Sequence, residues 1–244
     1  MNWDEKLKDF ENFLRFERNF SDNTLDAYVR DIRKLKDYAE AELPGIGPDT
    51  ITYTQLQEYL FGLSKLKFSE RSQARWISSI KAFFKYLLED EIREDNPSKL
   101  LEGPKLGLYL PDTLSLEDVE RVIKAINLDT DLGLRNQCLI EVLYGCGLRV
   151  SELIELKISN INFKENYLKV DGKGGKSRFV PLADYTTRLI RNYIDHVRSQ
   201  YKINKKHEDI LFLNSRGSSM SRVIVFIIIK ELTEKAGISK KISP

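Results

Sequence analysis

One ten-residue stretch, residues 144–153, constrains the fold of this chain more than any other. It reads YGCGLRVSEL. Two glycines break the apolar helix that precedes them, because glycine takes the left-handed conformation in which helices commonly stop. Arg149 then heads a short amphipathic turn. The stretch predicts a helical corner with an arginine at its vertex, although that arginine could equally pair with Glu152 or Glu155 one turn further on.

A second stretch, residues 172–178, reads GKGGKSR and places Lys173 at a strand turn, just before an apolar strand. Glycine-rich basic hairpin tips are common and are usually only solvated, so this stretch identifies no function alone. It ends like a nucleotide-binding Walker motif. That motif needs a glycine five residues before Gly175, where this chain has Val170, and we reject a nucleotide-binding loop.

Length and composition favour a soluble protein with two domains. The chain has 244 residues, of which 41% are hydrophobic and 31% charged, with a net charge of +2. No apolar run approaches the roughly 20 residues that a membrane span needs, and the N-terminus lacks a signal-peptide pattern. We therefore expect a cytoplasmic location and no membrane partner.

The cysteines and histidines argue against a metal site. Cys138 and Cys146 have no CxxC partner, and His196 and His207 are the only histidines. This inventory disfavours a zinc site and a disulfide framework. We expect both cysteines in or near the core, His196 as a surface or packing residue, no metal and no cofactor.

Apolar spacing and N-capping residues predict four helices in the first domain. Thr54 with Gln57 resembles a capping box at the start of the third. The expected helices cover residues 3–16, 21–38, 54–63 and 69–89.

The fourth of these helices has two opposite faces. When the helix is rotated by 100° per residue, its cations fall on one face, within an arc of about 120°. We call this face the cationic stripe. The stripe consists of Lys67, Arg71, Arg75, Ser78, Lys81 and Lys85, and the opposite, apolar face of Trp76, Ile80, Phe83, Phe84 and Leu87. A stripe nearly free of acids, Glu70 excepted, suits a row of DNA phosphates. The alternative is a solvated charged face.

Proline and glycine residues then mark a linker. We expect domains at residues 1–104 and 113–244, joined by residues 105–112. A capping pattern at Ser115–Asp118 opens the second domain. The remaining patterns predict helices at 117–125, 133–144, 182–201 and 221–236, and short strands of an antiparallel sheet at 158–163, 167–170 and 177–181.

The order and spacing of the two opening stretches resemble those of tyrosine site-specific recombinases of the phage integrase family, most closely the Xer type. The resemblance runs from about Trp3 to Pro244. It implies a mainly α fold with a small antiparallel β-sheet: a four-helix SAM-like core-binding domain, then an α+β catalytic domain of the DNA breaking–rejoining fold. It also implies cutting and rejoining of duplex DNA through a 3′-phosphotyrosine in the full-length form, by a homo- or hetero-tetramer on DNA that needs neither metal nor a small-molecule substrate.

The resemblance assigns roles to individual residues. Arg149 matches the first family arginine, which contacts the reacting phosphate, and Lys173 matches the hairpin lysine that protonates the leaving 5′-oxygen. Lys176 and Arg178 are expected to hold the DNA backbone. The full set of expected DNA contacts is Arg71, Arg75, Lys81, Lys85, Lys176, Arg178 and Arg222.

Departures from the family pattern lie at Cys146, where Thr is common, and at residues 237–244. Family members continue there into a His-x-x-Arg motif and the nucleophilic tyrosine, and no tyrosine of this chain stands in such a motif. We therefore expect these 244 residues to bind DNA without cleaving it. A non-catalytic DNA-binding protein and a helical protein-interaction module are the alternatives. The apolar run at residues 223–229 further predicts a final helix that is partly exposed.

Overall fold

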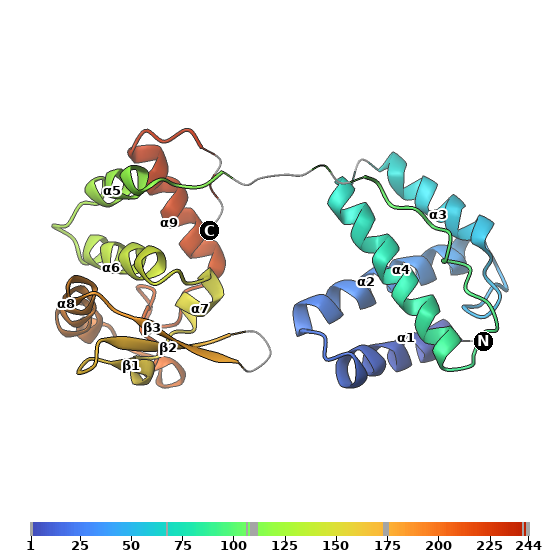
Figure 1. The fold of residues 1–244 in the computed structure, drawn as a ribbon, viewed down its shortest axis with the longest axis horizontal. Coiled ribbons are helices and arrows are strands. Elements are labelled where there is room, and N and C mark those ends of the chain that lie inside the picture. The colour runs from blue at the N-terminus through green and yellow to red at the C-terminus, as the bar shows by residue number, and fades with distance from the viewer. Residues whose placement is uncertain are drawn as a thin grey trace. The chain divides into compact units, whose positions relative to one another are not determined.

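The computed structural model describes residues 2–66, 68–105, 107, 112–172, 176–240 and 242. The chain divides into two compact units, residues 1–109 and 110–244 (Figure 1). Part of the predicted linker, residues 106 and 108–111, lies outside the described residues.

The described part of the first unit contains four α-helices, as the sequence predicts (Figure 1). The helices are α1 (Trp3–Asn12), which continues as a π-helical turn over Phe13–Glu17, α2 (Asp22–Glu42), α3 (Tyr53–Lys65) and α4 (Glu70–Glu89). α2 packs against α1 and α4. Every member of the predicted apolar face of α4 is buried, which confirms how this helix is anchored.

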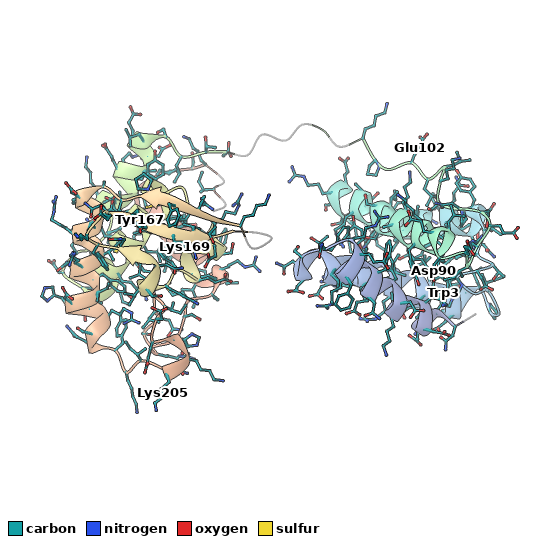
Figure 2. All side chains as sticks on the ribbon, turned by 60° about the horizontal axis from the view of Figure 1, so that its bottom comes forward. Trp3, Asp90, Glu102, Tyr167, Lys169 and Lys205 are labelled. Atoms are coloured by element: carbon teal, nitrogen blue, oxygen red, sulfur yellow. The ribbon has the colours of Figure 1, made fainter. Side chains whose placement is uncertain are left out.

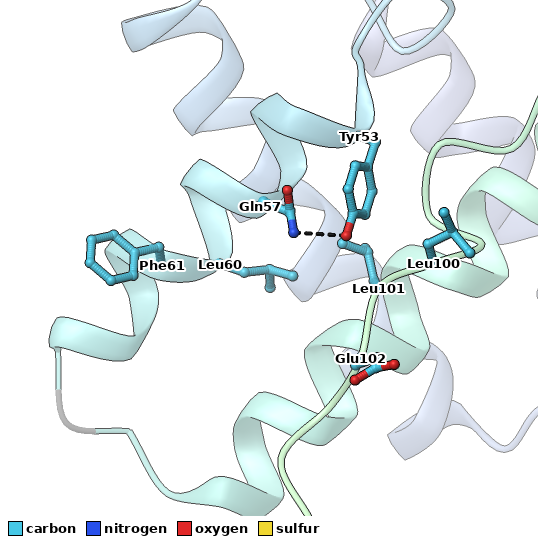
Figure 3. Close-up of a pocket in the computed structure, with 7 residues that line it drawn as sticks. All are labelled: Tyr53, Gln57, Leu60, Phe61, Leu100, Leu101 and Glu102. Atoms are coloured by element: carbon cyan, nitrogen blue, oxygen red, sulfur yellow. Dashed lines mark hydrogen bonds between the residues drawn. The ribbon is translucent and has the colours of Figure 1, made fainter.

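The predicted start of α3 is wrong by two residues. Thr52, not Thr54, is the N-cap, and its backbone N–H donates to Gln55 Oε1 at 2.9 Å. Ile51 is fully buried and anchors the chain immediately before the helix, so the first turn forms at Tyr53. Gln57 instead donates to the Tyr53 hydroxyl at 2.7 Å (Figure 3).

The second unit combines helices with a small sheet, and the predicted mainly α class with an antiparallel sheet is confirmed. Its helices are α5 (Leu116–Lys124), α6 (Asp131–Gly145), α7 (Val150–Ile154), α8 (Asp184–Asn192), which continues as π and 3-10 turns to Gln200, and α9 (Arg222–Lys235). α6 packs against α7 and α8, and α9 packs against α5 and α7. Among the described residues, no helix is both long and apolar enough to cross a membrane.

The sheet has the order β1-β2-β3 and is antiparallel throughout. Its strands are β1 (Ile161–Asn162), β2 (Tyr167–Asp171) and β3 (Ser177–Pro181). β1 is much shorter than predicted, because Ser159 donates from its N–H and its hydroxyl to the Asp209 carboxylate at 3.0 and 2.6 Å. These bonds hold the preceding residues in a 3-10 turn instead of a strand.

Strand register decides which side chains of the sheet face the core. Leu168 and Val170 are buried, while Lys169 between them is exposed on the other face (Figure 2 labels Lys169). Val170 pairs with Arg178, and Lys169 pairs with Phe179. Since paired residues of an antiparallel sheet share a face, Arg178 lies on the core side.

The predictions for the cysteines, His196 and the final helix are confirmed. Cys138 and Cys146 are buried, and burial raises the pKa of the Cys146 thiol to about 11. His196 is exposed. The exposed side chains of α9 include Val223, Phe226 and Ile227.

Candidate active site

The arginine corner forms at the junction of α6 and α7. α6 ends at Gly145, and Gly147 follows with φ +56°, a conformation that glycine adopts without strain. Of the two glycines, Gly147 therefore makes the break, whereas Gly145 still belongs to the last helical turn. Arg149 is the extended N-cap residue of α7.

Glu152 holds this corner together. Its Oε2 accepts a hydrogen bond from the Arg149 backbone N–H at 2.8 Å, and its Oε1 accepts one from Arg149 Nη1 at 2.9 Å. The Glu152 side chain is only 5% exposed, whereas that of Arg149 is 74% exposed. Among the described residues, the partner of the Arg149 guanidinium is Glu152 and not the alternative Glu155. The carboxylate thus lies below the surface and the arginine above it.

A second arginine reaches the same carboxylate from the sheet. Arg178 donates from Nη1 to Glu152 Oε1 and from Nη2 to Oε2, both at 2.8 Å. This two-pronged arrangement is the strongest geometry available to an arginine and a carboxylate. Strand register turns the Arg178 guanidinium toward Glu152, and the expectation that Arg178 holds the DNA backbone stays a prediction.

The two arginines stabilise the ionised form of Glu152. The hydrogen bonds from Arg178, followed by those from Arg149, lower the pKa of Glu152 to about 2 against the opposing effect of burial. Glu152 in turn raises the pKa of Arg178. With two cations and one anion, the Arg149–Glu152–Arg178 cluster carries a net positive charge.

Lys173 and its neighbours 174–175 lie outside the described residues, so its role stays a prediction. The flanks of the turn are described: the Gly172 N–H donates to the Lys176 carbonyl at 2.7 Å, and the Ser177 hydroxyl donates to Asp171 Oδ1 at 2.7 Å. Lys176 is exposed. These bonds close the base of the β2–β3 hairpin that carries Lys173.

Arg222 is the first residue of α9 and is exposed, on a helix that contacts α7. Tyr185, Tyr193 and Tyr201 do not stand in the family's nucleophile motif. Tyr193 is fully buried, its hydroxyl accepts a hydrogen bond from the Leu213 N–H at 3.2 Å, and burial raises its pKa to about 12. Within the described residues, no group of three or more His, Cys, Asp or Glu side chains is arranged to hold a metal ion.

The cationic stripe on α4 differs from its sequence-based description in two places. Arg75 pairs with Asp31 of α2, and Lys85 lies 3.5 Å from Glu89 one turn later. The stripe therefore has acidic partners that the prediction overlooked. Arg71 and Lys81 are exposed, and Lys67 lies outside the described residues.

A hollow of about 640 Å³ in the first unit opens between α3 and the segment around Leu101 (Figure 3). Tyr53, Gln57, Leu60, Phe61, Leu100, Leu101 and Glu102 line it. Glu102 is the only charged residue among these lining residues. This hollow therefore lacks the charge that a phosphate site requires.

Residues 112–244 match the phage integrase family, and residues 7–91 match the N-terminal SAM-like domain of phage integrases. The chain belongs to the phage integrase family. Tyrosine recombinase XerD of Oceanobacillus iheyensis is 37% identical over 98% of this chain and 80% of its own length. The XerD of Listeria innocua is 34% identical over the same shares. Members of this family are enzymes of site-specific DNA recombination, and this chain is one of them.

Solved integrase structures share the fold. The XerH recombinase bound to its difH substrate after cleavage has a TM-score of 0.71 at 20% identity, over 97% of this chain and 69% of that one. A lambda integrase dimer bound to a core site has a TM-score of 0.72 at 18% identity, over 98% and 80%.

The sequence predicts the arginine corner but not what holds it. It offers Glu152 only as a partner that would give Arg149 a structural role, although a Glu three residues after a helix start is a known capping signal. It does not predict the role of Asp31. No local pattern connects it to Arg75, because the two residues lie on different helices.

Proposed function

We propose that Arg149, held by Glu152, binds the DNA phosphate at which this recombinase cuts and rejoins a strand. The observation that carries the proposal is the exposed guanidinium of Arg149 above a buried carboxylate. Of the three guanidinium nitrogens of Arg149, only Nη1 has a hydrogen-bond partner in the described part of the chain. Donors on Nη2 and Nε are left for two phosphate oxygens, in a plane that a lysine cannot reproduce.

The chemistry is an in-line displacement at phosphorus. A tyrosine hydroxyl gives up its proton and its oxygen forms a bond to phosphorus, while the bond to the 5′-oxygen breaks and that oxygen takes a proton. We assign the proton to Lys173, which stands in the sequence between β2 and β3, the strand that also carries Arg178. Arg149 stabilises the negative charge that grows on the non-bridging oxygens, which is the largest single contribution in many such reactions.

Duplex DNA is the substrate of this proposal, and the exposed cations of α4 together with Lys176 and Arg222 are its further contacts. A solved relative is a lambda integrase tetramer bound to a Holliday junction. We infer that four copies of the recombinase act together on DNA in the cytoplasm.

DNA binding by residues 1–244 tests this proposal. The protein should bind a duplex with an affinity that falls steeply as salt rises, and Arg149→Gln should weaken it. On a suicide substrate that traps covalent intermediates, residues 1–244 should give no protein–DNA adduct, because no tyrosine among them follows a His-x-x-Arg motif. Salt-independent binding, or an adduct on denaturing gels, would contradict these assignments.

A further inference from the structure

A second buried carboxylate lies in the first unit, beneath the cationic stripe. Asp31, on α2, has a side chain that is only 1% exposed. Its Oδ2 accepts hydrogen bonds from Arg75 Nη1 at 2.5 Å and from the Ser79 hydroxyl at 2.9 Å, both on α4. Its Oδ1 is buried with no hydrogen-bond partner among the described residues.

This arrangement is costly to the protein unless the arginine stays in place. A buried carboxylate is strongly unfavourable without a cationic partner, and here a single oxygen receives every hydrogen bond. Nη1 of Arg75 also donates to the Ala27 carbonyl at 3.2 Å. Two acceptors on α2, the Asp31 carboxylate and the Ala27 carbonyl, thus hold one corner of the guanidinium, and Ser79 of α4 donates to the same carboxylate oxygen.

The rest of Arg75 remains accessible. Its side chain is 37% exposed, and it lies in the stripe between Arg71 and Lys81. A second ion pair of the stripe is different in kind: Lys85 Nζ lies 3.5 Å from Glu89 Oε1, and both side chains are exposed, so this carboxylate is not a buried anchor for the lysine. A fixed guanidinium loses less conformational entropy on binding than a mobile one.

We propose that Asp31 is a positioning residue for DNA binding, which holds Arg75 so that the exposed edge of its guanidinium meets a backbone phosphate. The inference rests on the proposed function, because it concerns a contact with the same DNA. The simpler reading is that Arg75 only neutralises Asp31.

The two readings predict effects of opposite sign. Asp31→Asn removes a negative charge near the stripe, so charge alone predicts tighter DNA binding. If Asp31 positions Arg75, the same substitution should instead weaken binding by about 3- to 10-fold. It should also reduce the magnitude of the negative slope of log K against log salt by up to about 0.9, the value of one phosphate contact.

Glu89→Gln is the matched control, because it also converts one ion-paired acid of the α4 region into its amide. It should leave affinity unchanged or raise it. The double variant Asp31→Asn/Arg75→Gln should bind DNA no more weakly than Arg75→Gln, because Asp31 acts through Arg75. Tighter binding by Asp31→Asn, matching Glu89→Gln, would overturn the proposal.

Folding must be separated from binding. Thermal unfolding of each variant defines a temperature at which it is folded, and DNA titrations by fluorescence anisotropy are done below it. If Asp31→Asn does not fold, Ser79→Ala replaces it, since it removes one hydrogen bond from the same oxygen and keeps the charge. It should weaken binding in the same direction but less, and unchanged binding would count against positioning.

Lys81→Gln distinguishes failure of this inference from failure of the proposed function. If Lys81→Gln makes the salt dependence of binding weaker while Asp31→Asn raises affinity, only the positioning role is lost. If neither Lys81→Gln nor Arg75→Gln changes the slope, the stripe does not face DNA, and the DNA surface of the proposed function fails with it.

Discussion

The two units each bury a carboxylate beneath an arginine, but they satisfy it differently. Glu152 receives hydrogen bonds from two arginines and one backbone N–H, which occupy both of its oxygens. Asp31 receives them from one arginine and one serine on a single oxygen. The first site keeps a net positive charge above the carboxylate, while the second is neutral. The comparison suggests that the first can stabilise a reacting phosphate and the second can only orient a contact.

The largest expected effect belongs to Lys173, because we propose a general acid in the second unit and only DNA binding for the first. In a cleavage-competent form, extended with the family's His-x-x-Arg and tyrosine segment, Lys173→Ala should slow cleavage by about 10²- to 10⁴-fold with little loss of binding. Single-turnover cleavage measures the rate. In a substrate with sulfur in place of the bridging 5′-oxygen, the leaving group departs without protonation, so the variant should recover most of its cleavage rate. If the rate is not recovered, Lys176 becomes the better candidate acid.

Replacing each exposed arginine by lysine sharpens the comparison directly. Arg149→Lys keeps the charge but loses the planar fork, and should slow cleavage about 10²- to 10³-fold, the usual cost of one donor to a developing oxyanion. Arg75→Lys should change binding but leave the rate of cleavage by bound enzyme unaltered. Equal losses of rate in both variants would remove the distinction between the two sites.

Glu152 should make stability depend on pH. Its pKa falls from the ordinary 4.5 to about 2 on folding, so its stabilising effect is complete above pH 4.5 and is lost as pH falls toward 2. Glu152→Gln should cost about 1–3 kcal/mol of unfolding free energy at neutral pH and should flatten the acid side of the profile. Urea unfolding from pH 6 to 2.5 measures both.

A residual acid dependence in the Glu152→Gln variant has an identified source. Hydrogen bonds from Lys240 and Ser115 lower the pKa of Asp118 to about 2, so this group titrates in the same window. Asp118→Asn is therefore the control. If Glu152→Gln leaves the pH profile of the wild type intact, Glu152 is not the group that responds.

The smallest effects concern the cationic stripe. Neutralising Arg71, Arg75 and Lys81 together should reduce the magnitude of the negative salt slope by up to about 2.7. Lys85→Gln should change the slope less, because Glu89 already competes for that lysine. Salt titrations from low to physiological ionic strength give the slopes. Equal slopes for the triple variant and the wild type would mean that the stripe is only solvated.

Local signals gave most of the fold. The Ser115–Asp118 capping box forms as expected, and α4 starts after its predicted cap Ser69. Both depend on contacts within one helical turn. Predictions failed where contacts between residues far apart in the sequence intervened: Asp209 holds the turn before β1, and Ile51 is buried in the core of the first unit directly before α3.

The sequence by itself determined where the helices break, which face of α4 is apolar, and that an arginine heads α7, because glycine conformation, periodicity and capping act over a few residues. Only the tertiary structure decided what holds the arginines. Arg178 and Glu152 are 26 residues apart, and Arg75 and Asp31 are 44 apart. Strand register and helix packing bring each pair together, and a buried carboxylate accepts whichever cation that packing delivers.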